Sequence, residues 1–286
     1  MKKSILFILA ALLTLSCEQL VPPSEPKLVV EGWIQNGGHP IVLLSESLPV
    51  ELGKEITAND MISSLAKWAK VTVNDGKKTV TLTGMVDETY FPPYVFSTNA
   101  ITGEVGKSYS LRIEYKDYVV TGETTIPEPV PLDTVYVASV QDSLCYVKCG
   151  FTDPPQKGNN YKFMTRTPGV DSRYHSSALA QLDDSQLDGY SEVFLYSTLR
   201  LMAVVAMPNL HLGEELWVKL CTLDQKAYEY WRDFEVMLYA NTFNMDFGVD
   251  NKGNVQGGLG YWVGYGVDKE VCIKLEEPKK TKEKQQ

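Results

Sequence analysis

The densest group of side chains that could bind a metal ion is an acidic segment in the second half of the sequence. Asp183, Asp184, Asp188 and Gly189 lie within seven residues. Ca²⁺ prefers carboxylate oxygens and accepts several of them in flexible geometry. The spacing is not that of an EF-hand loop, because no glutamate stands at its twelfth position. Two interpretations stay open: a calcium site formed by the three aspartates, or an exposed loop whose aspartates fix turns.

Side chains that could act in hydrolysis are scattered. Asp153 precedes two prolines, a pattern that fits either a carboxylate in a cleft or a rigid turn between strands. His175 and His211 could serve as catalytic bases, but the sequence has no G-x-S-x-G segment, which is the strand-turn-helix signature of a nucleophilic serine. The sequence contains 36 acidic residues, and nothing in it marks two of them as the paired acids of a glycosidase. We therefore predict no catalytic residue.

A glycine-rich loop spans residues 253–260. It superficially resembles a phosphate-binding loop, but it follows a predicted helix rather than a strand and lacks the Lys-Ser/Thr pair. We therefore interpret its glycines as positions of positive φ and close backbone packing.

Aromatic side chains gather in two places. Tyr90, Phe91 and Tyr94 lie in a proline-containing loop and are the predicted exposed contacts for a ligand or partner. The second group lies on and after a predicted helix. We expect it to form core between helix and sheet, although exposed members could form a binding platform. Its members are Tyr228, Tyr230, Trp231, Phe234, Tyr239, Tyr261, Trp262 and Tyr265.

Cys17 carries the most specific chemical prediction. Two lysines, an apolar run of eleven residues at positions 5–15 and Ser16 precede it. The run is shorter than the ~20 residues that cross a bilayer, and its layout is that of a secretory signal. A cysteine directly after a small residue at the end of such a run is typical of bacterial lipoproteins, in which the thiol is acylated. The alternative is an ordinary signal peptide with an incidental cysteine.

Lipidation would remove residues 1–16 and leave Cys17 at the start of a proline-rich tether, residues 17–26. We expect a lipid anchor in a membrane, with the leaflet left open. The formal net charge is −9, and no basic stripe is visible, so we expect no nucleic-acid partner.

Four further cysteines leave their redox state open. Cys145 and Cys149 lie in one predicted strand, about 13 Å apart, which is too far for a mutual disulfide. Each could pair with Cys221 or Cys272, or all four could be buried thiols. The absence of a C-x-x-C pair argues against structural zinc.

The elements that would position these residues are mostly strands, so we predict an all-β fold. About seven strand-like runs in residues 27–126 predict an Ig-like sandwich. Alternating prolines at 127–131 mark the passage into a second β-rich domain, residues 127–275. This domain carries one amphipathic helix, residues 225–242, with Asp224 as its N-cap. Residues 276–286 form a charged tail that we expect to be disordered.

The chain resembles the Bacteroidota lipoproteins of domain of unknown function 4249. Besides the signal, the resemblance rests on residues 26–34, 151–155, 158–161, 182–184, 187–189, 228–232 and 257–262. The chain departs from the family pattern after the helix, where residues 241–245 replace an Asn-Pro-containing stretch. The resemblance implies an outer-membrane lipoprotein, often associated with TonB-dependent transporters, and assigns no catalytic residue.

The expected function is therefore non-catalytic binding, as an accessory subunit of a TonB-dependent nutrient transporter, with no cofactor unless the aspartates hold calcium. Two alternatives remain: a surface hydrolase that uses Asp or Glu, and a structural or adhesin module.

Overall fold

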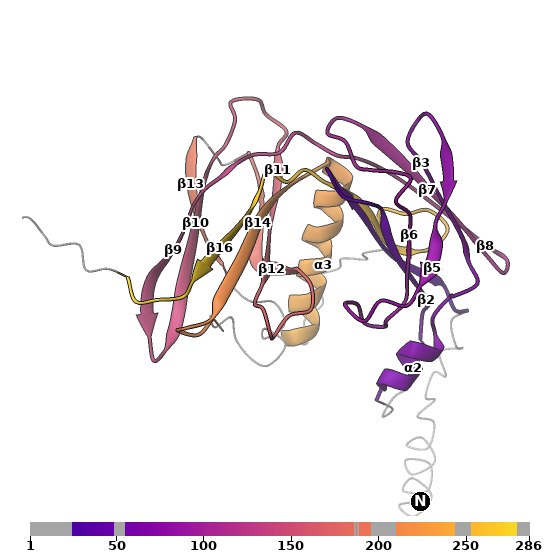
Figure 1. The fold of residues 1–286 in the computed structure, drawn as a ribbon, viewed down its shortest axis with the longest axis horizontal. Coiled ribbons are helices and arrows are strands. Elements are labelled where there is room, and N and C mark those ends of the chain that lie inside the picture. Colours follow the sequence, from indigo (N-terminus) through magenta and orange to yellow (C-terminus); the bar gives the residue numbers. More distant parts are fainter. Residues whose placement is uncertain are drawn as a thin grey trace, which may run out of the picture.

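The computed structural model describes residues 25–48, 55–185, 187, 189–195, 210–243 and 253–278. The predictions for residues 1–24, Cys17 included, for Asp188 and for residues 279–286 lie outside the described residues. Figure 1 shows two β-sandwiches side by side, which confirms the all-β prediction.

The first sandwich consists of two sheets. One has the strand order β15-β1-β2-β6-β5 and the other the order β4-β3-β7-β8. The strands of the first sheet are β1 (Leu28–Gln35), β2 (Ile41–Glu46), β5 (Thr83–Met85), β6 (Val95–Ser97) and β15 (Leu259–Tyr265). Those of the second are β3 (Lys70–Asn74), β4 (Thr79–Thr81), β7 (Ser108–Tyr115) and β8 (Tyr118–Thr125). A short helix, α2 (Ala58–Ser63), follows β2 and has no counterpart in the sequence-based prediction.

Side-chain alternation along β1 sets the two faces of this sheet. Leu28, Val30 and Ile34 are buried in the core between the sheets. Glu31 and Trp33 fall on the opposite face, because successive side chains of a strand point to opposite sides. That face looks toward the second sandwich, so β1 contributes both to the core and to the junction.

The second sandwich also has two sheets, with strand orders β13-β10-β9 and β12-β11-β14-β16. The first contains β9 (Leu132–Gln141), β10 (Leu144–Thr152) and β13 (Tyr190–Leu195). The second contains β11 (Asn160–Arg166), β12 (His175–Asp183), β14 (Glu215–Leu223) and β16 (Glu270–Lys274).

All four cysteines of the two sandwiches are free thiols. Cys145, Cys149 and Cys221 are buried, whereas Cys272 is exposed. The disulfide alternative is therefore wrong for this structure, and the alternative of four buried thiols holds for three of them. Burial raises the pKa of the Cys221 thiol to about 11, which keeps it protonated and unreactive.

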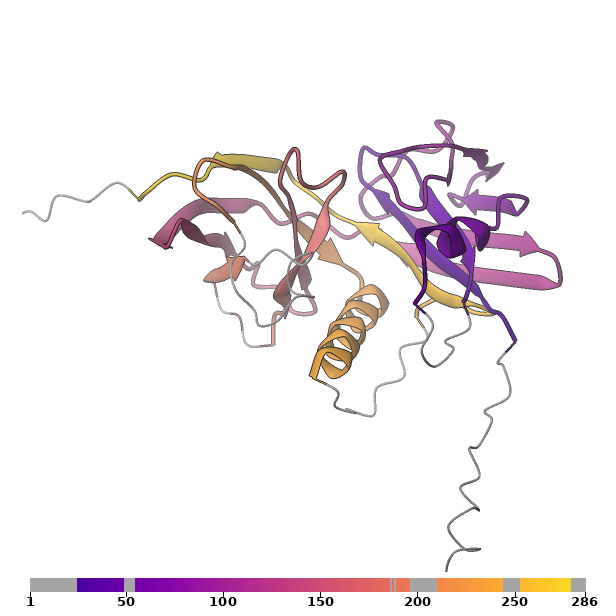
Figure 2. The ribbon, with the colours of Figure 1, turned by 90° about the horizontal axis from the view of Figure 1, so that it is seen from below.

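Helix α3 (Gln225–Phe243) and strand β15 join the two sandwiches. Figure 2 shows α3 beside their junction and the light-orange β15 running along the first sandwich. The second domain predicted from the sequence, residues 127–275, wrongly includes residues 259–265, because β15 pairs in parallel with β1, from Val29 opposite Leu259 to Gln35 opposite Tyr265. The reason is Trp262, which is buried in the first core and donates its Nε1 hydrogen to the Tyr109 carbonyl at 2.9 Å.

Asp224 begins α3 as predicted. Its Oδ1 accepts the Ala227 backbone N–H at 2.8 Å. Its Oδ2 accepts hydrogen bonds from the Thr124 hydroxyl and the Thr125 backbone N–H, at 2.7 and 3.1 Å. One carboxylate thus caps the helix and ties it to β8 of the first sandwich.

Replacing Asp224 with alanine is expected to destabilise the protein by roughly 2 kcal/mol or more, because it removes a helix cap and hydrogen bonds to a charged acceptor. Urea unfolding followed by circular dichroism measures the loss. Asp224→Asn retains one side-chain oxygen and should lose less. Equal losses in the two variants would contradict the double role of the carboxylate.

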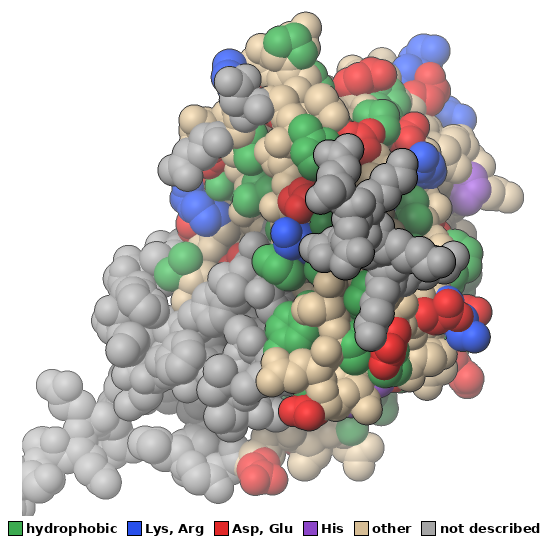
Figure 3. All heavy atoms as spheres, turned by 90° about the vertical axis from the view of Figure 1, so that its left-hand side faces the viewer, with side chains coloured by type: hydrophobic (Ala, Val, Ile, Leu, Met, Phe, Trp, Pro, Cys, Tyr) green, Lys and Arg blue, Asp and Glu red, His purple; other side chains and the backbone are tan. Residues whose placement is uncertain are grey.

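The surface of the described chain shows no segment suited to crossing a bilayer as a helix: neither α2 nor α3 combines the necessary length and apolar character. Figure 3 shows the face at the left of Figure 1. On the part of this face that is not grey, acidic and basic side chains lie among small patches of hydrophobic side chains. That part therefore presents no field of a single charge sign.

Candidate functional site

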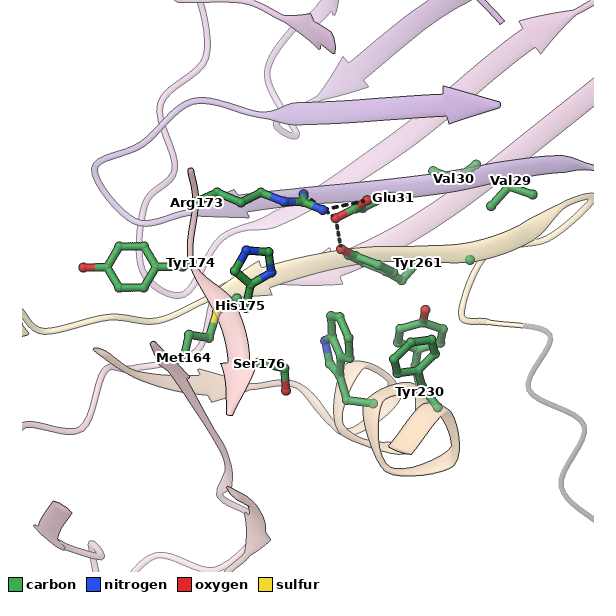
Figure 4. A pocket seen from close by; sticks show the side chains of 13 residues that line it. Val29, Val30, Glu31, Met164, Arg173, Tyr174, His175, Ser176, Tyr230 and Tyr261 are labelled. Carbon is green, nitrogen blue, oxygen red and sulfur yellow. Dashed lines mark hydrogen bonds and ion pairs between the residues drawn. The ribbon is translucent and has the colours of Figure 1, made fainter. Parts of the chain in front are cut away.

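A cavity of about 410 Å³ lies between the two sandwiches. Strands β1 and β15 form one side, and β11, β12 and α3 with the segment before β12 form the other (Figure 4). Its lining residues are Val29, Val30, Glu31, Met164, Arg173, Tyr174, His175, Ser176, Tyr230, Trp231, Phe234, Gly260 and Tyr261. Neither sandwich forms the cavity alone.

One wall of the cavity is aromatic. Tyr230, Trp231 and Phe234 project from one side of α3, because residues three and four apart share a helix face. Tyr261 of β15 lies 5.0 Å from the Tyr230 ring and 4.9 Å from the Trp231 ring, measured between centroids. Such tilted contacts between aromatic rings hold the wall together. The prediction that this group forms core between helix and sheet therefore holds for Tyr228, Trp231, Tyr261 and Tyr265, which are buried in one cluster, whereas Trp262 is buried in the core of the first sandwich.

A charged pair crosses the cavity from one sandwich to the other. Arg173 Nη1 donates to Glu31 Oε1 at 2.6 Å, and the Tyr261 hydroxyl donates to the same oxygen at 2.9 Å. Figure 4 shows both groups directed at this carboxylate. The Arg173 side chain is 25% exposed and that of Glu31 31%. Partly buried charges are tolerated where they are paired. The pair joins the two sandwiches, and it forms a polar end of the cavity.

A second, smaller cavity of about 180 Å³ adjoins the first and shares five lining residues with it, the charged pair included. It adds Trp33, Tyr90, Lys219 and Tyr265. Lys219 is 8% exposed, donates to Gln35 Oε1 at 2.9 Å and lies 4.4 Å from the Tyr174 ring. Two cations, Arg173 and Lys219, therefore lie at this end of the continuous space.

A fully buried lysine supports the aromatic wall from behind. Lys162 Nζ lies 3.7 Å from the centroid of the Trp231 ring and donates to Ser176 Oγ at 2.6 Å. Burial lowers the pKa of Lys162 to about 7, although the charge of Glu235 acts in the opposite direction. The Trp231 indole nitrogen is itself buried and has no hydrogen-bond partner of good geometry.

A family model described as "Domain of unknown function (DUF4249)" matches residues 17–270. The chain belongs to the DUF4249 family. The match spans both sandwiches and every residue that lines the two cavities. The interdomain site is therefore part of the DUF4249 region itself rather than of an appended segment.

Solved structures of low identity also align with this DUF4249 chain. A cytokine receptor complex is 7% identical, with 87% of this chain and 98% of that chain covered and a TM-score of 0.26. A two-domain fibronectin type III segment from chicken tenascin is 10% identical, with 70% and 91% covered and a TM-score of 0.22. Among curated proteins, none matches the DUF4249 chain.

The predicted contact residues of the loop separate in the structure. Tyr90 lines the smaller cavity, 5.9 Å from the Trp33 ring, and the Arg173 guanidinium lies 5.6 Å from the Tyr90 ring. Phe91 is 52% exposed, whereas Tyr94 packs edge-on against Phe96 at 5.5 Å, beside the first core. Of the three, the structure brings Tyr90 to the site.

The acidic segment has other partners than a metal ion. Asp183 accepts hydrogen bonds from the Ser185 backbone N–H and the Tyr228 hydroxyl, both at 2.9 Å. Hydrogen bonds from Ser185, above all, lower the pKa of Asp183. Asp184 accepts from the backbone N–H groups of Gly158 and Asn159, at 2.7 and 3.0 Å.

These contacts are typical of aspartates that fix turns, which is the role that the second interpretation gives them. Asp188 lies outside the described residues. Within the described part of the chain, no group of three or more His, Cys, Asp or Glu side chains could hold a metal ion. The calcium prediction therefore gains no support from the two aspartates that the structure places.

The hydrolysis candidates are not assembled at one place. Asp153 is buried and accepts a hydrogen bond from the Tyr161 hydroxyl, so its role is structural. His175 lines the larger cavity, and burial lowers the pKa of its ring. His211 instead forms a bridge with Leu144 at the edge of the second sandwich.

The glycine-rich loop has the role assigned to it. Gly253, Gly257 and Gly260 have φ angles of 92°, 81° and 99°. A Cβ atom at Gly260 would lie 1.9 Å from the Val30 carbonyl oxygen. The loop thus brings β15 against β1 and closes one side of the cavity.

Sequence reasoning missed the charged residues of the site. Three of them, Glu31, Lys162 and Lys219, each stand alone among apolar or aromatic neighbours in a strand, whereas Arg173 follows Asp171 and Ser172 just before one. A charged residue within a buried strand is the signal that could have marked Lys162 and Lys219, because such residues are rarely buried without a partner.

Proposed function

We propose that this DUF4249 protein is a non-catalytic binding lipoprotein of the Bacteroidota outer membrane. In this proposal it is anchored through Cys17 and acts as an accessory subunit of a TonB-dependent nutrient transporter. The single observation that carries the binding role is the aromatic cavity between the sandwiches, crossed by the Arg173–Glu31 pair. The anchor and the transporter rest on the signal sequence and on the family resemblance.

The cavity supports a small-molecule ligand in both size and chemistry. Ligand sites typically measure about 300–1,000 Å³ and combine apolar walls with a few polar groups that fix orientation. Here Tyr230, Trp231, Phe234 and Tyr261 offer apolar surface. At the polar end Glu31 balances the charge of Arg173, so Lys219 leaves one excess positive charge. The ligand class that fits this layout has a ring or other apolar body and an anionic group.

The position of the acidic side chains favours binding over hydrolysis by Asp or Glu. Asp153, Asp183 and Asp184 do not line the cavity. Glu31 does, but its carboxylate is held by Arg173 and Tyr261. A structural or adhesin role is less well supported, because the aromatic side chains converge on a cavity rather than on a flat exposed patch.

Binding is tested with 1-anilinonaphthalene-8-sulfonate, an aromatic anion whose fluorescence rises in apolar surroundings. Tyr230→Ala is expected to weaken its binding roughly tenfold, because the loss of aromatic contacts costs about 1.4 kcal/mol. Phe194→Ala is the matched control, since Phe194 is 41% exposed and lies on β13, away from the cavity. Equal affinity for Tyr230→Ala and the unsubstituted protein would refute a ligand at this wall.

The transporter partnership is tested in cells. Deletion of the gene should reduce uptake of the nutrient, and the native lipoprotein should copurify with a TonB-dependent transporter. Unchanged uptake together with no transporter in the purified complex would remove this part of the proposal.

One contact favours a second candidate function, hydrolysis by a serine. A neighbouring neutral amine can activate a serine nucleophile, and Lys162 Nζ lies 2.6 Å from Ser176 Oγ at the cavity wall. Against this role, the Ser176 hydroxyl donates to the Ser177 carbonyl at 3.2 Å. Fluorophosphonate labelling that is lost in both Ser176→Ala and Lys162→Met would establish the hydrolase. Absence of labelling leaves the binding function.

A further inference from the structure

One end of the first sandwich carries exposed apolar side chains that its own core does not use. Ile56 is 50% exposed, Met61 40%, Ile62 39% and Trp68 92%. We call these four residues the apolar end. Large hydrophobic side chains scattered singly on a surface need no explanation, but four within thirteen residues on and around one helix do.

Helix α2 is ordered without burying any of its residues. Thr57 and Asp60 form a reciprocal capping box that starts the helix. None of the helical side chains is buried, so the apolar residues of α2 contribute nothing to the core of the sandwich. Their exposure is therefore a property of the surface that the helix presents, rather than a by-product of packing.

The chain enters the sandwich at this same end. The Ser47 backbone N–H donates to the Lys27 carbonyl, and the Lys27 N–H donates to Ser47 Oγ. One residue earlier, the Glu46 N–H donates to the Ser64 carbonyl at the end of α2. Hydrogen bonds of Ser47 and its neighbour thus connect the start of β1 to the apolar end.

The distance from the lipid anchor to this end is limited. Ten residue-to-residue steps lead from Cys17 to Lys27, and an extended chain advances at most about 3.6 Å per step. The start of β1 is therefore held within roughly 35 Å of the bilayer surface.

We propose that the apolar end docks on the lipid bilayer, with Trp68 at the level of the headgroups. This inference rests on the lipid anchor of the proposed function. Tryptophan is favoured at membrane interfaces because its ring is both apolar and a hydrogen-bond donor. Anchor and apolar end together restrain the sandwich in one orientation, which a flexible tether alone would not do.

The attraction is apolar rather than electrostatic. Lys67 and Lys70 flank Trp68, but Lys67 lies over the Tyr94 ring at 5.8 Å, and Lys70 pairs with Glu114 at 3.4 Å. Lys116, at the nearby hairpin, pairs with Glu46. Two of these three lysines are paired with acidic groups, so the apolar contact should dominate, and it should depend little on salt.

The test uses the full acylated protein reconstituted on vesicles of brominated phosphatidylcholine, which quench tryptophan that reaches the bilayer. The chain has five tryptophans, so the difference between the unsubstituted protein and Trp68→Phe isolates the Trp68 signal. We expect that difference signal to be quenched by at least half relative to unbrominated vesicles, at both low and high salt.

A tryptophan at a remote site provides the matched control. Phe194→Trp in the Trp68→Phe background places an exposed ring on β13 of the second sandwich, and its signal should not be quenched. If the protein floats with the vesicles but Trp68 is not quenched, or if position 194 is quenched equally, docking is refuted while the anchor stands. If the protein does not float with the vesicles, the anchor itself fails, and the docking proposal fails with it.

Discussion

Gly260→Ala is expected to lower the free energy of unfolding by roughly 2–5 kcal/mol, which makes it one of the most damaging conservative changes in the chain. Two costs add. At φ 99° an alanine pays about 1–2 kcal/mol for a left-handed conformation. Its Cβ would also lie 1.9 Å from the Val30 carbonyl oxygen, and forcing extra atoms into packed surroundings costs typically 1–3 kcal/mol.

The matched control for this substitution is Gly158→Ala. Gly158 has a nearly identical φ of 98°, but a Cβ there would meet no atom within 4 Å. It should therefore lose the conformational cost alone, about 1–2 kcal/mol. Urea unfolding followed by circular dichroism compares the two. Similar losses at both positions would show that the approach of β15 to β1 is not tightly packed, contrary to the structure.

Gly260 also tests how stability and the site are connected. It lines the cavity and lies opposite Val30 in the parallel pairing of β1 and β15. An alanine that separates these strands should displace Tyr261, whose hydroxyl binds Glu31. Gly260→Ala is therefore expected to lose binding of the fluorescent anion under conditions where it remains folded, whereas Gly158→Ala should retain it.

The sequence was sufficient for those features that depend on local pattern. Strand alternation and turns predicted the all-β fold. Asp224 predicted the start of α3, and the observed helix ends within one residue of the expected end. The glycines of 253–260 were correctly interpreted as positions of positive φ and close backbone packing, because few other residue types tolerate that combination.

The pairings between distant segments were not predictable in this way. The strand pattern around residues 259–265 is compatible with a strand in either sandwich. For that reason β15 was assigned to the wrong sandwich. The two residues of the central ion pair are separated by 142 positions, and neither has a local sequence context that marks it. Tyr90 was found because an aromatic loop is unusual, whereas Lys162 was overlooked within an ordinary strand.

Lys162 gives the second large effect, a contribution to the free energy of unfolding that rises with pH. Burial lowers the pKa of its ammonium to about 7, whereas a lysine in the unfolded chain titrates near 10.4. Between these values the unfolded chain binds one proton more than the folded protein. The contribution of Lys162 to the free energy of unfolding should therefore increase by about 1.4 kcal/mol per pH unit from about pH 7.5 to 9.5, measured as the difference between the unsubstituted protein and a variant that lacks the lysine. Below pH 7 both states are protonated, and the full cost of the buried charge is present.

Other groups titrate in the same window, and the buried thiols act in the opposite direction: the pKa values of Cys145, Cys149 and Cys221 are raised, so unfolding releases their protons above about pH 8.5. A difference between two proteins that both retain these cysteines cancels this effect.

Glu235 of α3 and Cys221 of β14 both raise the pKa of the lysine, but burial outweighs them. His175, beside Ser176, titrates below this window, because burial lowers the pKa of its ring from 6.5. The pKa of the nearby Tyr230 is raised, chiefly by burial. Its hydroxyl therefore stays neutral in the folded protein up to about pH 9.5, and a tyrosine in the unfolded chain, with a pKa near 10, stays mostly neutral there too.

Lys162→Met removes the charge while keeping the length of the side chain and a favourable contact with the Trp231 ring. This variant should be more stable than the unsubstituted protein at pH 6.5, by on the order of a few kcal/mol, and that difference should shrink by about 1.4 kcal/mol per pH unit between about pH 7.5 and 9.5. Lys226→Met, at an exposed position of α3, is the control, and its difference from the unsubstituted protein should not change with pH. Urea unfolding across this pH range measures all three proteins. A difference between Lys162→Met and the unsubstituted protein that does not change with pH would mean that the ammonium is stabilised where it lies, and that the aromatic wall of the cavity is backed by a permanent charge.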